Sequence, residues 1–507
     1  MAPSLIMALA ALLYAVFIWR TAFDIAGHTY FTLVDDAMVS MRYAQHLAQG
    51  FGLVWNIGQK PVEGFTNPGW MLVMALIHLL PLPMARMSLG VMVVSALILL
   101  ANILVVYKLC EIARPASSVG PIMAALITAF YFPLIFWSLR GMEVGLLLLL
   151  IDGAVLTAVQ MKESKPRTAL LLGLLLSLAV LVRLDALIQV FIVIAYVVFT
   201  RGIKHSPILP LMLVLMTVSI VLIFQRLYFG DFLPNTYYQK MAETSVLERV
   251  TNGVLAFYQH ALWDTLLPAL ISFACLAVYK DFRRPETVLL AGLFAAQCAY
   301  SVWVGGDYAE VEVNAANRFI SQGMPPLIIL FSLAIQRLLQ DVHLPWRQTP
   351  TLQTVTAIGI AMLALVVMSG RPWKAWVSDN APLLKADIRR TRLGLFLARN
   401  TAPEAVIAVH AAGQIPYYSG RTTIDLLGLN DPVVAKGPVT GPFYPGHDKW
   451  NYEYSIVQLR PDVIADNWIK LGAFMKDKKD YIHLDNGLYV RRDSRLVDLA
   501  GLSQEYR

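Results

Sequence analysis

Two adjacent aspartates, Asp35 and Asp36, are the residues of this chain that are best suited to chemistry. They follow the first long apolar segment, where a carboxylate pair close to lipid is costly. A positioned carboxylate can take the proton of an attacking hydroxyl, so the pair indicates an acid/base centre. One Asp could instead cap a short helix that begins at Ala37, although a cap needs only one carboxylate. The pair could also hold a divalent cation; the metal is unknown, and no other cofactor is implied.

Residues 227–258 contain a second group of polar side chains next to an apolar run. Lys240 offers a compact positive charge that suits a phosphate, and paired tyrosines can stack on a ring or donate their hydroxyls. Ordinary explanations exist as well, because tyrosine often anchors a chain at a membrane surface and a lysine is often simply solvated. We interpret the stretch as part of a substrate site whose candidate binding residues are Asp231, Asn235, Tyr237 and Tyr238.

Several charged residues stand at the ends of other apolar runs. Arg183 lies two residues before Asp185, and Glu143 ends a neighbouring polar join, so local ion pairs explain these residues as well as substrate binding does. Asp307 and Arg318 bracket another short polar loop. An arginine that opens an apolar run is costly unless it is paired or lines a cavity. We therefore take Arg318 and Arg183 as candidate anion ligands, and Glu143 and Asp307 as candidate substrate-binding residues.

These residue types suit the transfer of a sugar from a lipid phosphate. Lys240, Arg318 and Arg183 could neutralise the departing phosphate, while Asp35 or Asp36 removes the proton of the acceptor hydroxyl. Direct displacement by the acceptor inverts the anomeric carbon, and the donor's own phosphate bond supplies the energy. The sequence has no P-loop, no Gly-x-Gly-x-x-Gly run after a strand and no His-x-x-x-His zinc signature.

The elements that position these groups are predicted to be membrane helices. The chain has 507 residues, of which 57% are hydrophobic and only 15% are charged. Its mean hydropathy is +0.58, and long apolar runs recur from Ser4 to Gly370. These runs are too long for barrel strands, so we expect a polytopic α-helical membrane protein. The net charge of +7 needs no nucleic-acid partner, because membrane proteins collect Lys and Arg on cytoplasmic loops.

We predict about eleven spans, separated by short polar joins. They lie near 4–22, 88–109, 118–138, 141–161, 168–184, 186–201, 206–226, 259–279, 286–304, 318–338 and 351–371. The stretch 69–83 is shorter and ends in Pro-Leu-Pro, which favours a surface or re-entrant helix. The loops near 108–117, 162–167, 201–205, 280–286 and 337–347 are rich in Lys and Arg, which makes that face cytoplasmic. The first loop (23–68), the 227–258 loop and the C-terminus then lie outside.

The composition changes after Arg371. Residues 372–507 carry an ordinary density of charge, with strand-like runs at 406–409 and 462–465 and a helix-like stretch at 383–398. We expect two domains: a transmembrane catalytic domain over 1–371, with surface helices in its first outer loop, and an extracytoplasmic α/β domain over 372–507. The three cysteines form no disulfide or metal pattern.

The order of these motifs resembles the GT-C superfamily of polyprenyl-phosphate-sugar transferases. Asp35-Asp36-Ala with Arg42-Tyr43, and the later run Glu63-Gly-Phe-Thr-Asn67-Pro, are similar to the terminal arabinofuranosyltransferases of mycobacteria and their bacterial relatives. Similar motifs recur farther along the chain. They are Gly141-Met-Glu143, Arg183-Leu-Asp185, Gly230-Asp231 to Lys240, Gly305-Gly-Asp307, and the run from Ala411 through Asp431.

The resemblance implies a decaprenyl-phosphoryl-arabinofuranose or similar donor and a cell-envelope glycan, glycolipid or glycoprotein acceptor. It implies that Asp35 or Asp36 is the catalytic base, and that Arg42, Tyr43, Glu63 and Asn67 belong to the substrate site. A Gly and an Asn-Pro are equally typical of a simple turn, so the Glu63 run has a structural explanation as well. The implied location is the bacterial plasma (inner) membrane, with the active site and the C-terminal domain outside.

Two other functions are compatible with a polytopic chain. A transporter or flippase of lipid-linked sugar would keep its polar residues near the middle of the bilayer, whereas here they gather at one boundary. A structural or receptor protein would use the C-terminal domain alone to bind a glycan. We favour the glycosyltransferase.

Overall fold

The computed structural model describes residues 2–113, 118–161, 166–202, 208–307, 310–341, 350–378 and 384–504. The chain forms two compact units. Unit 1 contains residues 1–20, 92–221 and 247–382, and unit 2 contains residues 21–91, 222–246 and 383–507. The division falls inside two long helices, α4 (Met84–Ala113) and α10 (Ile208–Tyr228). Each unit is described by itself.

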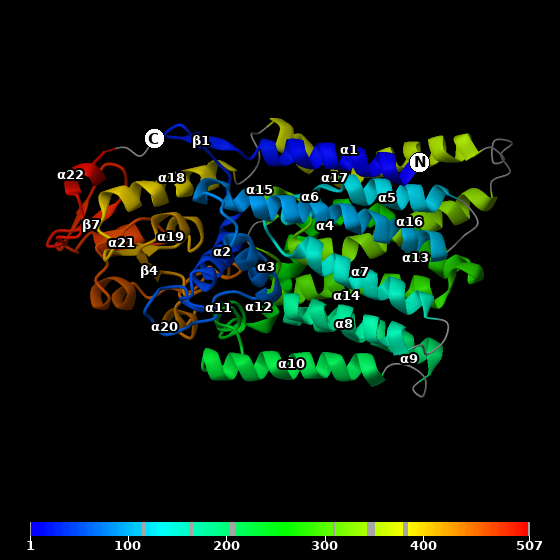
Figure 1. Ribbon diagram of the computed structural model, residues 1–507, viewed down its shortest axis with the longest axis horizontal. Helices are drawn as coiled ribbons and strands as arrows, with labels where there is room; N and C mark the ends of the chain where they lie inside the picture. The colour runs from blue at the N-terminus through cyan, green and yellow to red at the C-terminus, as the bar shows by residue number, and fades with distance from the viewer. Residues whose placement is uncertain are drawn as a thin grey trace. The chain divides into compact units, whose positions relative to one another are not determined.

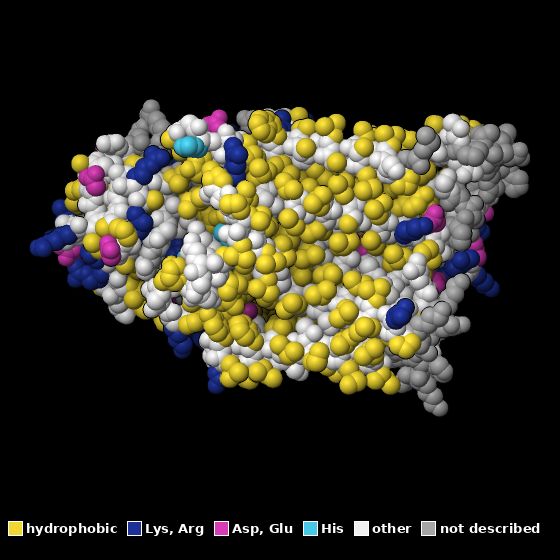
Figure 2. Space-filling model, in the orientation of Figure 1, with side chains coloured by type: hydrophobic (Ala, Val, Ile, Leu, Met, Phe, Trp, Pro, Cys, Tyr) yellow, Lys and Arg dark blue, Asp and Glu magenta, His cyan; other side chains and the backbone are white. Residues whose placement is uncertain are grey.

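Unit 1 is a bundle of apolar helices that lie roughly alongside one another (Figure 1). Besides parts of α4 and α10 it contains α1 (Ala2–Trp19), α5 (Val119–Phe130), α6 (Phe132–Leu139), α7 (Val144–Gln160), α8 (Pro166–Val182), α9 (Leu187–Arg201), α12 (Val246–Ala256), α13 (Leu262–Val278), α14 (Pro285–Val304), α15 (Glu310–Val313), α16 (Arg318–Asp341) and α17 (Pro350–Ser378). α16 is the buried centre and packs against α5, α13 and α14. Over these helices, the face seen in Figure 2 is largely hydrophobic, as expected of a surface in contact with lipid.

The described residues include seven helices that are long and apolar enough to cross a membrane, and a bent pair that could make an eighth. That pair is α5 and α6, which meet at an angle of 48°. Pro133 stands in the first turn of α6, where its missing N–H and fixed φ separate the two helices. α1, α7 and α8 are 17 or 18 residues long and occupy the other predicted spans, near the lower limit for a crossing.

These helices confirm the predicted fold class, a polytopic α-helical membrane protein. α3 (Pro68–His78) has only 11 residues, in agreement with the prediction that 69–83 makes no full crossing. Parts of the loops that set the predicted orientation lie outside the described residues, namely 114–117, 162–165, 203–207 and 342–349. The cytoplasmic face therefore stays a prediction.

Unit 2 begins with a hairpin of β1 (Phe23–Ile25) and β2 (His28–Tyr30). Ala26 and Gly27 both have positive φ, the conformation that a tight two-residue hairpin turn uses. The chain continues into α2 (Asp35–Ala48), which packs against α3 and against α19 (Gln414–Ser419). A short helix from the later loop, α11 (Asn235–Met241), packs on α20 (Pro432–Ala435).

The C-terminal part of unit 2 is a five-stranded mixed sheet with strand order β4-β3-β5-β7-β6. Its strands are β3 (Val406–Val409), β4 (Thr422–Asp425), β5 (Val463–Ile464), β6 (Tyr481–His483) and β7 (Tyr489–Arg491). β3 pairs in parallel with both β4 and β5, while β7 pairs antiparallel with β5 and β6. Three helices complete the region: α18 (Leu384–Asn400), α21 (Leu471–Met475) and α22 (Leu499–Leu502).

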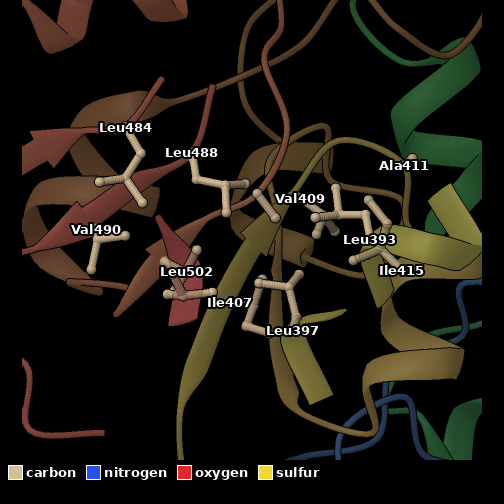
Figure 3. Close-up of a cluster of buried hydrophobic side chains, with 12 residues drawn as sticks. Leu393, Leu397, Ile407, Val409, Ala411, Ile415, Leu484, Leu488, Val490 and Leu502 are labelled. Atoms are coloured by element: carbon tan, nitrogen blue, oxygen red, sulfur yellow. The ribbon is translucent and has the colours of Figure 1, made fainter. Parts of the chain in front are cut away.

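The alternation of side chains along β3 gives this sheet a core on each face. Ile407 and Val409 join a cluster with Leu397 of α18, which Figure 3 shows in close-up. Ala408, between them, joins the opposite cluster with Ile464 of β5. The predicted α/β character of the C-terminal region is therefore confirmed, with α18, β3 and β5 at their predicted places. The domain division at residue 371 stays a prediction; the first outer loop and residues 222–246 pack within the same unit as residues 383–507.

Candidate functional site

Asp35 and Asp36 are the first two residues of α2, and both side chains are half-buried. The N-cap residue of α2 is Val34, and no side chain caps this helix. The alternative in which an aspartate caps a helix beginning at Ala37 is therefore wrong. Two carboxylates in a first helical turn are favoured by the helix dipole, which stabilises their negative charge.

The carboxylate of Asp35 is held by backbone N–H groups of a distant segment within unit 2. Gly413 donates to both oxygens at 3.2 Å, and Gln414 donates to Oδ1 at 2.9 Å. A Cβ on Gly413 would lie 2.0 Å from the backbone carbonyl oxygen of Asp35, so only glycine allows this approach. The loop between β3 and α19 thus fixes where Asp35 points.

Residues of the C-terminal region, among them an arginine and a histidine, interact electrostatically with the two aspartates. Burial raises the pKa of Asp35, while the positive charge of Arg390 and the N–H of Gln414 oppose that rise and the charge of Asp36 adds to it. His447 interacts electrostatically with Asp36 and with Lys240, and burial lowers its pKa to about 4, so it is neutral at pH 7. The site therefore combines carboxylates, a neutral imidazole and a lysine.

Sequence analysis missed His410, Asp466 and His447. His410 directly follows β3, and its Nδ1 lies 2.9 Å from Oδ2 of Asp466, which follows β5. His410 and Asp466 come just after the two strand-like runs. This position could have identified them, because polar residues gather at the carboxyl ends of parallel strands.

Arg42 is buried, and its guanidinium donates hydrogen bonds to backbone and amide oxygens. It donates to the carbonyls of Trp55 (2.6 Å) and Arg421 (2.7 Å), to Oδ1 of Asn56 (3.0 Å), and to the carbonyl of Pro416. These bonds tie α2 to the C-terminal part of unit 2. The predicted substrate-binding residue Arg42 therefore holds the site's framework together.

Tyr43 and Asn235 occupy comparable positions. The Tyr43 hydroxyl lies 2.7 Å from the carbonyl of Val62 and 3.0 Å from Oδ1 of Asn430. Asn235 donates through Nδ2 to the carbonyls of Gly428 (2.7 Å) and Leu429 (3.0 Å). Both predicted substrate-binding residues thus fasten the loop that follows β4.

Glu63 and Asn67 are buried and hydrogen-bonded inside unit 2. Gln225 donates to both carboxylate oxygens of Glu63, at 3.1 and 2.9 Å, and burial raises the pKa of Glu63 to about 7. Asn67 accepts a hydrogen bond from Ser40 of α2 at 2.8 Å. The Glu63–Asn67 run is therefore part of the packing beneath α2.

The candidate residues of the 227–258 stretch differ in their partners and in their exposure. Asp231 pairs with Lys436 at 2.7 Å and accepts a bond from the Tyr238 hydroxyl at 2.9 Å, whereas the side chain of Tyr237 is exposed. Lys240 is half-buried, and a Cβ on Gly446 would lie 2.9 Å from its Cε. Lys240 interacts electrostatically with His447, which also interacts with Asp36. Lys240 is therefore the candidate of this stretch that is linked to the aspartates.

The remaining candidates belong to unit 1 and form buried ion pairs. Arg183 donates to Glu143 and to Asp185, each at 2.6 Å. All three residues therefore take part in ion pairs, and their role in substrate binding stays a prediction. Arg318 lies 3.0 Å from Asp307. Both arginines also approach the ring of Phe319, at 5.6 and 5.3 Å from its centroid. A phosphate at either arginine would share that charge with a carboxylate.

Among the residues that the structure describes, no group of three or more His, Cys, Asp or Glu side chains is placed to hold a metal ion. The cation suggested for Asp35 and Asp36 therefore stays a prediction that rests on the carboxylate pair alone.

Comparison with known proteins gives one family model and several solved structures. A model described as "Domain of unknown function (DUF8728)" matches residues 383–487. No curated protein matches the chain. The apo oligosaccharyltransferase of Archaeoglobus fulgidus is similar with a TM-score of 0.52 and 12% identity, over 83% of this chain and 64% of that one. This chain thus spans less than two thirds of that protein.

Two further structures carry a lipid phosphate. ArnT from Cupriavidus metallidurans, bound to undecaprenyl phosphate, has a TM-score of 0.53 and 12% identity, over 83% of this chain and 85% of its own. The Archaeoglobus oligosaccharyltransferase AglB, in complex with an inhibitory peptide and a dolichol-phosphate, has a TM-score of 0.53 and 11% identity, over 92% of this chain and 69% of its own. The chain therefore shares the fold of these proteins, which confirms the predicted fold class.

Proposed function

We propose that this chain is a membrane glycosyltransferase that moves a sugar from a polyprenyl-phosphate donor to a hydroxyl of a cell-envelope acceptor. The observation that carries the proposal is the fixed carboxylate of Asp35, with Asp36 next to it, on a GT-C fold. Structures of that fold have been solved with undecaprenyl phosphate and with a dolichol-phosphate bound, which supports a lipid-phosphate donor.

In the proposed reaction, Asp35 or Asp36 takes the proton of the acceptor hydroxyl as its oxygen bonds to the anomeric carbon. The bond between that carbon and the phosphate oxygen breaks, and the polyprenyl phosphate leaves with the electron pair. The configuration of the anomeric carbon is inverted, because one displacement occurs. Lys240 is our first candidate for stabilising the charge of the leaving phosphate; Arg183 and Arg318 stay predictions for the same role.

The finer assignment follows the sequence resemblance. We propose arabinofuranose as the sugar, a decaprenyl or similar carrier, and a glycan, glycolipid or glycoprotein acceptor. The site would face the outside of the bacterial inner membrane. Among the predicted substrate-binding residues we assign contact with substrate first to Tyr237 and Tyr238. Arg42, Tyr43 and Asn235 are proposed to act through position, since their polar groups bond within unit 2.

The test is transfer by the purified full-length protein in lipid nanodiscs. Synthetic polyprenyl-phosphoryl-arabinofuranose would be compared with the glucose and mannose analogues, and products would be identified by mass spectrometry. We expect a glycoside product that is lost in the double variant Asp35→Asn/Asp36→Asn. Asp24→Asn is the matched control, because Asp24 lies exposed in the β1–β2 hairpin of the same loop and accepts a hydrogen bond from Thr29 at 2.8 Å.

The same preparation separates the enzyme from the transporter alternative. In sealed proteoliposomes, a flippase would move the donor across the bilayer and form no glycoside. Such movement, together with the absence of product for every donor and acceptor, would overturn the enzymatic proposal.

A further inference from the structure

The strand order of the small sheet identifies a position where ligands bind in open α/β sheets. From β3 the chain crosses through α19 to β4 on one side, whereas β5 lies on the other side of β3. The connections therefore diverge between β3 and β5. In parallel sheets, ligands bind outside the carboxyl ends of the strands at such a switch point.

The residues at this switch point are polar and aromatic. His410 follows β3 and Asp466 follows β5, with Nδ1 and Oδ2 2.9 Å apart. The same β3–α19 loop supplies Gly413 and Gln414, which hold the carboxylate of Asp35. The switch point and the proposed catalytic carboxylates are thus parts of one site within unit 2.

A set of neighbouring rings lies there as well. The Trp468 ring centroid is 5.0 Å from that of His410 and 5.5 Å from that of His447, and the planes are tilted by 34° and 43°. The ring centroid of Tyr444 lies 5.2 Å from that of His447. Trp468, His447 and Tyr444 are half-buried, so each ring keeps some exposed surface.

Trp468 also carries a polar group that lacks a partner. Its indole Nε1–H is buried and has no hydrogen-bond partner among the residues that the structure describes. A buried donor without a partner costs free energy, and native proteins accept that cost mainly where a ligand or water completes the bond. This donor is available to a ligand that lies against the ring.

The ionised carboxylate at the switch point suits a ligand with many hydroxyls. Burial alone would raise the pKa of Asp466, but its hydrogen bond with His410 and the positive charges of Arg390 and Arg389 hold it below its ordinary value. Asp466 is therefore an ionised acceptor for hydroxyl donors. An aromatic face next to fixed polar groups is the usual composition of a site for a small ring-shaped ligand.

We propose that Trp468, His410, Asp466 and His447 form a sugar-binding subsite at the switch point of β3 and β5, which presents the sugar ring to Asp35 and Asp36. The ring of the sugar lies against Trp468, and its hydroxyls bond to Asp466 and to the imidazoles. The inference rests on the proposed function for the statement that this sugar is a substrate. The sugar belongs either to the donor or to the acceptor, and the experiment distinguishes the two.

The kinetic test compares Trp468→Ala with His483→Ala in the full-length protein. His483 stacks on Tyr489 at 4.4 Å in β6, which is separated from β5 by β7, so its loss should leave transfer unchanged. We expect Trp468→Ala to raise the KM of one substrate at least tenfold while kcat changes less than threefold. A rise in donor KM with slower donor hydrolysis assigns the subsite to the donor; a rise in acceptor KM alone assigns it to the acceptor. Two unchanged KM values would overturn the subsite.

Trp468 also packs against the core cluster of β5 and α21, so truncation could disturb folding. Trp468→Phe keeps a ring and removes the N–H, and Asp466→Asn keeps the shape and removes the charge. If Trp468→Ala melts early, the same comparison is made with these two variants, and tenfold effects on the same KM are expected from Asp466→Asn. An unchanged KM in both would overturn the subsite.

A binding measurement separates this inference from the proposed function. Saturation-transfer NMR on the detergent-solubilised wild type, with soluble arabinofuranose and hexose oligosaccharides as probes, should show contact that Trp468→Ala abolishes. Sugar contact without any transfer would refute the proposed function and leave the subsite standing. Transfer together with equal sugar contact in wild type and Trp468→Ala would refute the subsite and leave the proposed function standing. A wild type that contacts none of the probes would also overturn the subsite.

Discussion

Gly413→Ala should abolish most transfer without unfolding the protein, because of the approach between Gly413 and Asp35. The added Cβ would lie 2.0 Å from the Asp35 carbonyl oxygen and 2.9 Å from Oδ1, whereas ordinary contact begins at 3.4 Å. The β3–α19 loop must therefore retreat by about 1.4 Å. The hydrogen bonds from Gln414 (2.9 Å) and Gly413 (3.2 Å) to the Asp35 carboxylate then become too long to form, and Asp35 loses its fixed orientation.

A displacement of about 1 Å at a catalytic group can cost about a hundredfold in rate. We therefore expect kcat to fall roughly a hundredfold in Gly413→Ala, measured as glycoside formed from the polyprenyl-phosphate sugar. The control is Gly472→Ala in α21, where the nearest atom to the new Cβ is 3.9 Å away. Thermal melting of both variants checks the fold. A Gly413→Ala protein that transfers sugar at the wild-type rate would refute the role given to this loop.

Four other predictions concern residues of unit 2. Asp36→Asn should lower transfer at least about a hundredfold with donor affinity retained, measured by single-turnover kinetics and donor titration; equal rates would contradict a catalytic role. Because burial raises the pKa of Asp35, kcat/KM should fall in acid with a midpoint above the ordinary Asp value of about 3.9; a profile flat to pH 4 would contradict this. Glu63 has a pKa of about 7 when folded against 4.5 as its reference, so the stability it contributes is complete below pH 4.5 and is lost as pH rises through 7. Glu63→Gln should therefore raise the melting temperature at pH 8 more than at pH 5. The corresponding gain in the free energy of unfolding is up to about 3 kcal/mol. Arg42→Lys should destabilise the protein by about 3 kcal/mol or more, because one ammonium cannot reach acceptors arranged for a guanidinium fork; an unchanged melting temperature would argue against the framework role.

The membrane helices could be predicted because span length and hydropathy are local properties of the sequence. The predicted span 118–138 shows the limit: it is two helices, α5 and α6, bent by 48° at Tyr131. Pro133 was visible in the sequence, but a proline in an apolar helix either kinks or is accommodated, according to its neighbours. Composition alone therefore predicted the crossing and missed its break.

The candidate site was only partly predictable. The positions of Arg42 and Asn235 were recognised. Yet Arg42 bonds the carbonyl of Arg421 and Asn235 bonds that of Gly428, which are 379 and 193 residues away along the chain, and no spacing pattern reveals such partners. The residues His410 and Asp466 come together only because β5 pairs with β3. Strand order is a property of the whole sheet, so two short strand-like runs could be predicted while their adjacency could not.

The contacts of Asp35 suggest how the two aspartates divide their work. Each N–H that donates to Asp35 stabilises its ionised form and also occupies lone pairs that would otherwise receive a proton from the acceptor. A carboxylate bound in this way is well suited to hold the start of α2 against the β3–α19 loop. Asp36, one residue along the same helical turn and electrostatically linked to His447, is then placed by that anchorage. On this view Gly413 acts on the chemistry through Asp35, and Asp36 is the better candidate for the base, because a base must exchange protons while its anchor must not.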